Sequence, residues 1–326
     1  MELIHKIKNK ILNSDSSKVR SFGLFLQKKC AKFINSHIGT MLLCSPHMDD
    51  KKYIMKKHMK ALHYYPDLDN PKSFNEKNNW RKLHDRKDIY TSFVDKYKIK
   101  SIISERIGAE HTFPLLGVYD KPSDIDFGSL PEKFVLKVNH VSGGVFICRD
   151  KSKFDKKKVL KDIKRFLKID YYLPSREWPY KNIERKIVCE KYMGENLIDY
   201  KNYCFNGKLA YTFVWQNVAK IDGRKPVAYY CGGYDRCWNK TSMEVEYPTM
   251  DEVVPKPDCY VEMVECCEKM SQGLPFARVD CYIINNHVYV GEVTFFPWGG
   301  FLKFKDEQWN MKLGEMEKLT DEHLGD

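Results

Sequence analysis

The sequence predicts an α+β fold, because its strand-like segments occur as adjacent hairpins with helical segments between them. Two runs rich in β-branched and aromatic residues flank Asn285-Asn286. A second hairpin is indicated between residues 199 and 217, where Asn206-Gly207 is a typical two-residue turn. Paired segments of this kind predict antiparallel sheets.

Start and stop signals predict the remaining elements. Ser73 and Glu76 form a capping box at the start of a helix, and Gly108 ends a later helix that begins after Asp95. Residues 218–258 are expected to be loop-rich. In chain order, the further elements are helices at 51–64, 73–84 and 95–107, a strand at 113–119, a strand–loop–strand unit at 134–154, a helix at 155–168, a short strand starting at 187, and a helix at 259–270.

Length and composition indicate a globular protein with more than one lobe. The chain has 326 residues, of which 43% are hydrophobic and 13% aromatic. Its net charge is +11, but residues 1–60 hold thirteen basic and four acidic residues, so +9 of this charge lies there and +2 elsewhere. No nucleic-acid-binding module or interleaved arginine accompanies these lysines, so we expect no nucleic-acid partner.

Residues 1–45 form a basic leader in which lysines alternate with apolar residues at helical spacing. No uncharged run is long enough to span a bilayer. Such a helix either lies on an anionic membrane surface or docks on the body with its lysines outward. The eleven cysteines include no Cys-x-x-Cys pair, no zinc-site spacing and no preceding signal peptide. We therefore expect reduced thiols in a cytoplasmic protein, with peripheral membrane contact as an option.

The hairpin at 278–300 carries one carboxylate on each strand, Asp280 and Glu292. A three-residue loop of Asn285, Asn286 and His287 would place the two acids directly opposite each other, whereas a two-residue loop would put them on opposite faces. We favour the first register because Asn tolerates the left-handed conformation that this loop needs. Facing carboxylates repel unless a cation lies between them, and hard oxygen ligands suit Mg²⁺.

A lysine and a glycine loop suggest a phosphate site in the strand–loop–strand unit. Lys137 lies within an apolar strand, where a cation is costly unless it meets an anion. Close behind it, Ser142-Gly143-Gly144 can present backbone N–H groups to a phosphate, although such a turn is also an ordinary hairpin loop.

Several motifs occur in a fixed order along residues 65–320. They are Asn70-Pro71-Lys72-Ser73-Phe74-Asn75-Glu76-Lys77, Asp95-Lys96, Leu130-Pro131-x-x-Phe134-Val135-Leu136-Lys137-x-Asn139-His140, Glu177-Trp178-x-Tyr180, Asp199-Tyr200-Lys201, Phe205-Asn206-Gly207-Lys208, Arg278-x-Asp280 and Gly291-Glu292-x-Thr294-Phe295-x-Pro297. Together these motifs resemble the ATP-grasp superfamily, and most closely the TupA-like ATP-grasp proteins of bacterial surface-polysaccharide loci.

The resemblance implies an ATP-grasp fold, with a nucleotide held between two α+β lobes. It divides the chain into the leader at 1–45, an N-terminal helical region at 46–92, a smaller lobe at 93–187 and a larger lobe with the Mg²⁺ site at 188–326. The implied nucleotide contacts are Lys96, Lys137, Ser142, Gly143 and Gly144 for the phosphates, Glu190, Lys191 and Met193 for adenine, and Glu195 for the ribose.

The same resemblance assigns the metal and the chemistry. Asp280 and Glu292 would hold Mg²⁺, with Thr294 where many family members have Asn, a better metal ligand than a hydroxyl. Arg278 would steady the transferred phosphoryl group, and Lys201 would be a further phosphate or substrate contact. His140 is the candidate acid–base residue, with a structural loop histidine as the alternative.

Superfamily chemistry implies an ATP-dependent carboxylate–amine ligase that forms an amide through an acyl phosphate. The expected partners are ATP, an amino acid or other amine, and a carboxylated sugar or glycan acceptor, in capsule or surface-polysaccharide biosynthesis. The alternatives are a glycosyltransferase, suggested by Asp67-Leu68-Asp69 and Asp124-Ile125-Asp126, an ATP-dependent glycan kinase, and a non-catalytic membrane-associated scaffold.

Overall fold

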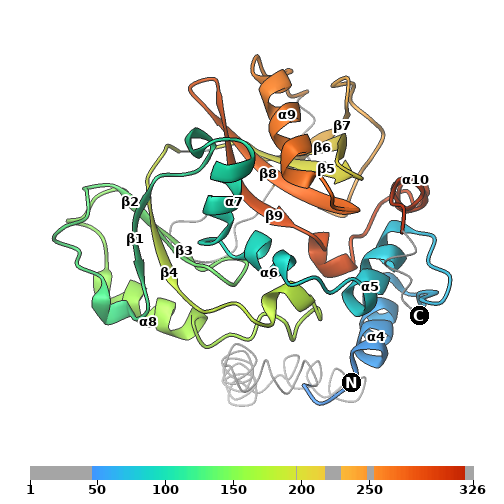
Figure 1. Cartoon of the computed structure of the whole chain (residues 1–326), viewed down its shortest axis with the longest axis horizontal. Coiled ribbons are helices and arrows are strands. Elements are labelled where there is room, and N and C mark those ends of the chain that lie inside the picture. Colours follow the sequence, from blue (N-terminus) through green and yellow to red (C-terminus); the bar gives the residue numbers. More distant parts are fainter. Residues whose placement is uncertain (1–45, 196, 217–228, 248–252, 320–326) are drawn as a thin grey trace, which may run out of the picture. The chain divides into compact units, whose positions relative to one another are not determined.

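The computed structural model describes residues 46–195, 197–216, 229–247 and 253–319. The chain divides into two compact units, Met1–Met48 and Asp49–Asp326, and every element below belongs to the second (Figure 1). The basic leader at 1–45 lies outside the described residues. Within the part of the chain that the structure describes, no helix has the length and hydrophobicity needed to cross a bilayer.

The second unit has an α+β architecture built on two antiparallel sheets, as expected. The helices are α4 (Asp50–Leu62), α5 (Phe74–His84), α6 (Ile89–Val94), α7 (Ile99–Arg106), α8 (Lys156–Phe166), α9 (Tyr260–Ser271) and α10 (Gln308–Met316), with short 3-10 turns η1 (Ala109–His111), η2 (Pro122–Asp124), η3 (Trp178–Tyr180) and η4 (Pro297–Gly300). The strands are β1 (Leu115–Tyr119), β2 (Phe134–Val138), β3 (Val145–Cys148), β4 (Ile187–Lys191), β5 (Asp199–Phe205), β6 (Lys208–Gln216), β7 (Tyr229–Asp235), β8 (Phe276–Ile284) and β9 (His287–Thr294).

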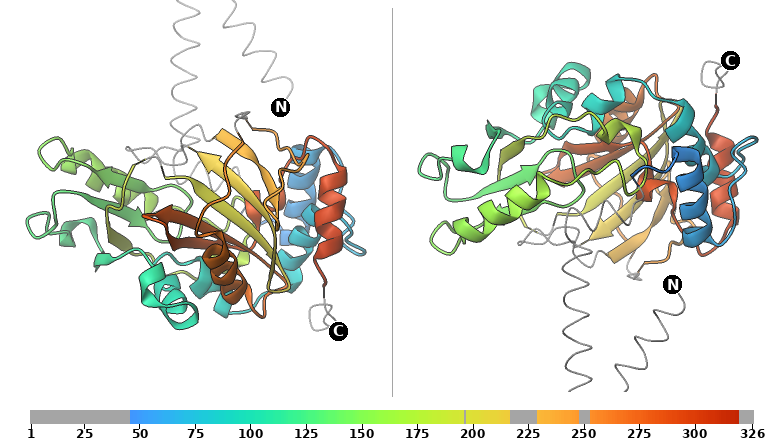
Figure 2. Two further views of the ribbon diagram at one scale, coloured as in Figure 1. Left: turned by 90° about the horizontal axis from the view of Figure 1, so that it is seen from above. Right: turned by 90° about the horizontal axis from the view of Figure 1, so that it is seen from below.

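The smaller sheet has the order β1-β4-β2-β3 and is covered by α8. Val159 and Ile163 of α8 pack in one buried cluster with Phe134, Phe146 and Ile187 of the strands. The lysines of α8 are on its other side, so the helix is amphipathic, as its sequence indicates. Figure 2 shows this sheet and α8 at one end of the unit, with α4, α5 and α10 at the other.

The larger sheet has the order β7-β6-β5-β8-β9 and is covered on both faces. On one face, Ala277, Val279 and Cys281 of β8 pack with Met263 and Cys267 of α9. The alternate residues of β8 point to the other face, because successive side chains of a strand alternate. This second face is covered by α5 and α10, whose buried side chains pack against aromatic residues of the sheet.

The start of α5 is fixed as the sequence predicts. The Ser73 hydroxyl accepts from the backbone N–H of Glu76, and the Glu76 carboxylate accepts from that of Ser73, which completes the capping box. Further along α5, Arg81 is fully buried and donates to Glu317 at 2.8 Å. A buried ion pair of this kind holds the end of the described chain against the helix.

The β8–β9 hairpin places Asp280 opposite Glu292, as predicted, but by a different route. Ile284 pairs with His287, so the loop has only two residues, Asn285 and Asn286, both with positive φ (52° and 56°). Such a turn is the common type I′ hairpin. The pairing then shifts by one residue between Asp280 and Cys281, which makes a β-bulge on β9.

The extra residue of the bulge is Gly291. A Cβ atom there would lie 2.6 Å from Cε2 of Tyr282, so a side chain could not be accommodated without movement. The predicted three-residue loop is therefore wrong, whereas the predicted facing of the two acids is confirmed.

Three elements differ from the sequence expectations. The segment that was expected to be loop-rich contains β7, an edge strand with Gly232 and Gly233 in its interior. Glycine weakens a strand signal, which explains why the pattern was not recognised. Helices α6 and α10 have no predicted counterparts either. The nine cysteines within the described ranges are free thiols, and all except Cys237 are buried, as expected for reduced thiols.

Candidate functional site

A cluster of ionised side chains lies on the face of the larger sheet that is opposite α9. Asp280 is 1% exposed and accepts from Arg278 twice, at 2.6 and 2.7 Å, and from Lys201 Nζ at 2.7 Å. Lys201 also donates to Asp199 at 2.7 Å. The strands explain this arrangement, because Lys201 of β5 is paired directly with Asp280 of β8.

Glu292 and Thr294 of β9 complete the cluster. The Nη2 atom of Arg278 donates to Glu292 Oε1 and to Thr294 Oγ1, at 3.0 Å in each case. Arg278 therefore links both acids to the hydroxyl of Thr294. Bidentate hydrogen bonds between a guanidinium and a carboxylate are geometrically specific, so this contact fixes the orientation of Asp280.

Burial and neighbouring charges act in opposite directions on these groups. Burial raises the pKa of Asp280 to about 7 even though Arg278 and Lys201 oppose it. For Glu292, burial alone would raise the pKa, but the charges of Lys96, Arg278 and Lys201 outweigh it and lower the pKa to about 2. The two facing acids thus have pKa values far apart, as is common at functional sites.

Lys96 approaches Glu292 from the segment between α6 and α7. Its Nζ donates to the carbonyl of Val141 at 2.6 Å, which ties it to the glycine loop after β2. The neighbouring Asp95 accepts from Asn139 Nδ2 at 2.9 Å, so the same loop is held at a second point. Burial lowers the pKa of Lys96, and the Glu292 carboxylate partly offsets this effect.

The glycine loop, Ser142-Gly143-Gly144, has a backbone conformation that suits glycine. Gly143 and Gly144 both have positive φ (84° and 63°), a conformation that most other residues adopt only with strain. Ser142 hydrogen-bonds to Tyr171, whose pKa is raised mainly by burial and also by Glu177 and Glu292. The loop therefore lies close to the acidic cluster of the larger sheet.

Lys137 and Glu190 face each other on neighbouring strands of the smaller sheet. The Lys137 Nζ lies 2.5 Å from Glu190, and Lys100 of α7 lies 2.6 Å from the other oxygen of the same carboxylate. Glu190 is 4% exposed, and its pKa is lowered because these two cations outweigh the effect of burial. The anion that Lys137 required in its apolar strand is thus Glu190.

The other expected nucleotide contacts lie at the end of β4 and just after it. The backbone N–H of Lys191 donates to the carbonyl of Pro114 at 2.9 Å, and Met193 is half-buried. Glu195 forms an ion pair with Arg149 at 2.9 Å and is more than half exposed. The roles of these residues toward a nucleotide stay predictions.

His140 has a buried environment that favours the structural alternative. Its Nε2 lies 3.0 Å from the carbonyl of Ile169, and its Nδ1 is buried without a hydrogen-bond partner among the described residues. Burial lowers its pKa to about 4, and the charges of Arg185 and Lys96 act in the same direction. The ring is therefore neutral at pH 7, with Nε2–H donating to the carbonyl.

Several residues near the cluster were not singled out from the sequence. Asp199 shares Lys201 with Asp280, and its Oδ1 is buried without a hydrogen-bond partner within the described part of the chain. Tyr180 has a raised pKa through burial and the proximity of Glu177, and Glu292 also contributes. The only sequence signal for these residues was their position within the motifs shared with the family, because their contacts arise from the tertiary fold.

Comparison with protein-family models identifies the fold family. The model of the TupA-like ATP-grasp proteins matches residues 76–318, which is most of the chain. This chain belongs to the TupA-like ATP-grasp family. Membership indicates an ATP-grasp fold, ATP binding and an ATP-dependent ligase. No curated protein sequence matched the chain.

Solved structures that resemble this TupA-like ATP-grasp protein include two amino acid ligases. One is a D-alanine–D-alanine ligase from Bacillus anthracis complexed with ATP, at 20% identity over 63% of this chain and 55% of that chain, with a TM-score of 0.35. An L-amino acid ligase from Bacillus licheniformis matches at 12% identity over 74% and 45%, with a TM-score of 0.38. The chain thus spans less than two thirds of the length of either protein.

The donor set in the larger sheet of this TupA-like ATP-grasp protein fits Mg²⁺. Asp280 and Glu292 face each other across β8 and β9, and the Thr294 hydroxyl is directed to the same place by Arg278. All three offer the hard oxygen ligands that Mg²⁺ prefers. The nearby lysines and Arg278 would balance the charge of bound phosphates.

Proposed function

We propose that this protein is an ATP-dependent carboxylate–amine ligase that attaches an amino acid or another amine to a uronic acid or other acidic group of a surface polysaccharide. The observation that carries the proposal is the cluster in which Arg278 and Lys201 hold Asp280 opposite Glu292. Lys96 approaches Glu292 from the segment between α6 and α7. Family membership supports ATP as the nucleotide, and this cluster is the place where we propose that the phosphoryl group is transferred.

In this proposal the smaller sheet binds the nucleotide. Lys137 and Lys96 contact the phosphates, and the N–H groups of Ser142, Gly143 and Gly144 close over them. Glu190, already held by two lysines, contacts adenine together with the backbone of Lys191 and Met193. Glu195 takes the ribose, for which it must exchange its ion pair with Arg149.

The larger sheet carries out the transfer. Asp280, Glu292 and Thr294 would hold Mg²⁺, which would neutralise negative charge on the phosphates during transfer. Arg278 stays fully charged, because Asp280 and Glu292 outweigh the effect of burial and raise its pKa. It can therefore stabilise the transferred phosphoryl group and then the tetrahedral adduct formed when the amine attacks the acyl phosphate. Lys201 also donates to Asp280 and, together with Arg278, fixes its orientation.

An aromatic group beside Arg278 supports a sugar ring as the acceptor. The ring of Trp298 lies 5.8 Å from Cζ of Arg278, and its Nε1 donates to the hydroxyl of Tyr247 at 2.9 Å. Trp298 adopts a positive φ of 51°, and Tyr247 is 40% exposed. A non-glycine residue held in this strained conformation is a frequent feature of ligand sites. Its face offers a stacking surface for a carboxylated sugar.

One assay, run with paired variants, distinguishes the proposed ligase from its two rivals, a glycan kinase and a glycosyltransferase. ADP release is measured with amino acids as amines and uronic acids as carboxylates, and free phosphate is measured in parallel. A ligase releases phosphate in step with ADP and needs the amine, whereas a kinase leaves the phosphate on the glycan. We expect ADP and phosphate to rise together only when both acceptors are present.

The variants Asp280→Asn and Glu292→Gln should lower turnover by about 100-fold or more, because loss of a metal ligand removes several kcal/mol of charge stabilisation. The matched control variants are Asp124→Asn and Asp126→Asn, which change exposed turn residues that cap backbone N–H groups. A glycosyltransferase that used the Asp-x-Asp motif would show the reverse pattern. Full ATP turnover in both Asp280→Asn and Glu292→Gln would refute the metal assignment.

A further inference from the structure

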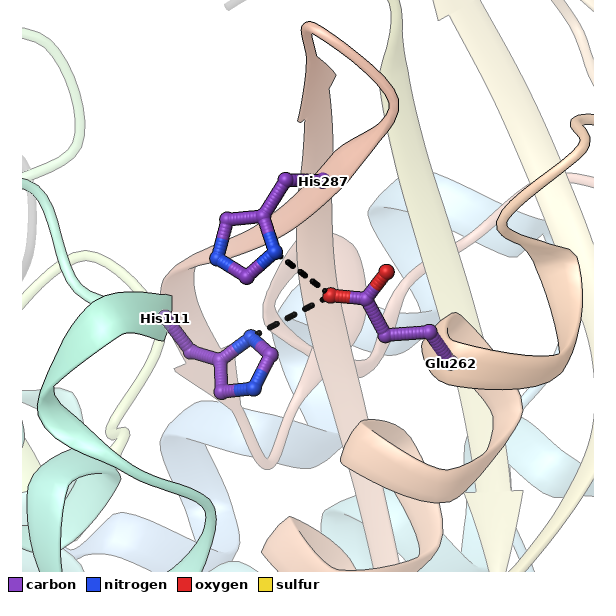
Figure 3. Close-up of side chains that lie close together, drawn as sticks. All are labelled: His111, Glu262 and His287. Atoms are coloured by element: carbon purple, nitrogen blue, oxygen red, sulfur yellow. Dashed lines mark ion pairs between the residues drawn. The ribbon is translucent and has the colours of Figure 1, made fainter.

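Three side chains that the proposed ligase chemistry does not use converge at the edge of the larger sheet. His111 comes from η1, Glu262 from α9 and His287 from the first residue of β9. Figure 3 shows both imidazole rings directed toward the same carboxylate oxygen. Their donor atoms all lie within 4.8 Å of one another.

The donor atoms of the three residues lie around one common point. Glu262 Oε1 lies 2.8 Å from Nδ1 of His287 and 3.7 Å from Nδ1 of His111. Donor atoms bound at about 2.0–2.2 Å to a tetrahedral zinc ion lie roughly 3.3–3.6 Å apart. The two separations from Glu262 bracket this value, and the remaining pair of donor atoms lies within 4.8 Å, so an ion would draw the two rings together.

The hydrogen bonds around His287 leave a lone pair on its Nδ1 directed at Glu262. Nε2 of His287 lies 3.1 Å from the carbonyl of Glu110, so this nitrogen carries a proton and donates it there. In the neutral ring Nδ1 then has a lone pair, which faces the Glu262 carboxylate at 2.8 Å. Two acceptors at this distance require either a second proton or a metal ion between them. A histidine whose other nitrogen is held by a carbonyl is the usual form of a metal ligand.

The surroundings hold the three residues in place. The rings of His111 and His287 are stacked with centroids 4.8 Å apart, and Glu262 Oε1 accepts from the backbone N–H of Val288 at 3.1 Å. His111 Nδ1 donates to the carbonyl of Val288 at 2.8 Å, so this nitrogen would have to lose its proton, or pass it to Nε2, before it bound an ion. β9 is an edge strand, so the backbone N–H and carbonyl of Val288 both face away from the sheet.

We propose that His111, Glu262 and His287 form a binding site for a divalent transition-metal ion of the zinc type, separate from the Mg²⁺ site. Two imidazoles and one carboxylate are a ligand set that zinc proteins use, whereas Mg²⁺ prefers an all-oxygen set. His111 is buried and the other two are about one third exposed, so water can complete the coordination. The buried thiol of Cys266 touches His111 at 3.7 Å but stands outside the three-donor group.

The ion would join three segments that are far apart in sequence. The segment with His111 leads into β1 of the smaller sheet, Glu262 belongs to the helix that covers the larger sheet, and His287 begins the strand that carries Glu292. Thr112 also makes a parallel bridge with Val290, so the two segments already run side by side. Such an ion acts as a structural staple, and the inference does not depend on the ligase proposal.

The test is zinc binding by the full chain without a histidine tag. The protein is stripped with a chelator, dialysed into excess Mg²⁺ so that the acidic cluster is occupied, and titrated with ZnCl₂ in a calorimeter. We expect one Zn²⁺ per chain and an increase in Tm on zinc addition. The variants His287→Gln and Glu262→Gln should each weaken binding at least tenfold and abolish the increase in Tm.

The matched control is Glu265→Gln, which makes the same charge change at an exposed position of α9 and should leave zinc binding unchanged. Because His111 is buried, the test relies on the two more exposed ligands, and the Tm of each variant in chelator reports whether it folds. The proposal is overturned if the wild-type chain binds no Zn²⁺, which would mean a hydrogen-bonded histidinium only. It is also overturned if His287→Gln and Glu262→Gln bind Zn²⁺ as tightly as wild type, which would place the ion elsewhere.

Discussion

Acidification should destabilise this protein through His140. Burial depresses the pKa of this histidine to about 4, whereas in the unfolded chain it has its ordinary pKa of 6.5. Between these values the unfolded chain binds a proton and the folded chain does not, so stability falls as the pH falls through this window. The linkage relation gives a loss of about 2 kcal/mol at pH 5 relative to pH 7.5. His58, whose pKa is also lowered by burial, adds a loss of the same sign.

The measurement is urea unfolding of wild type and His140→Gln at pH 7.5 and pH 5. The glutamine amide can still donate to the carbonyl of Ile169 but does not titrate, so the variant should lose about 2 kcal/mol less on acidification. An equal loss in both proteins would refute the reasoning.

The same variant tests the role of His140 in catalysis. A neutral ring whose Nε2 is held by a carbonyl cannot serve as a general acid near neutral pH. We therefore expect His140→Gln to keep the shape of the pH profile of ATP turnover. A loss of one limb of that profile would restore His140 as an acid–base residue.

Two further substitutions test other parts of the site. Gly291→Ala should destabilise the protein by about 1–3 kcal/mol and lower ATP turnover. The reason is that the new Cβ would meet Tyr282 and displace the bulge that orients Glu292. A Tm equal to that of wild type, measured by calorimetry, would contradict this expectation. Trp298→Ala should raise the KM for a uronic acid about fivefold, since a stacking contact contributes about 1 kcal/mol, and should leave the KM for ATP unchanged. Equal changes in both KM values, measured by ADP release, would show that Trp298 has no specific role toward the acceptor.

The sequence was most informative where a local pattern and a shared motif agreed. The capping box at Ser73 and the turn at Asn206-Gly207 depend on neighbouring residues, so they could be predicted directly. The pairing of Asp280 with Glu292 was also predicted, although the loop length was not. A lone glycine in a strand is a known sign of a bulge, and Gly291 was the signal that could have corrected the register.

Contacts between distant segments could not be predicted in the same way. Lys100 was only a helix residue in the sequence, yet it shares the Glu190 carboxylate with Lys137. His111 and His287 are 176 residues apart, and their ring contact depends on how η1 lies against the edge of β9. A single sequence shows periodicity and turns but not which surfaces meet.

The bulge at Gly291 acts as a phase shift within β9. Val290 faces α9 and Glu292 faces Arg278, although residues two apart on a regular strand would share a face. Removing Gly291 alone should leave Glu292 opposite Asp280, because Cys281 pairs with Val290 and Glu292 would then be the next residue of a regular ladder. The bulge therefore lets the strand hold one more residue than a regular ladder allows while the two acids keep their pairing.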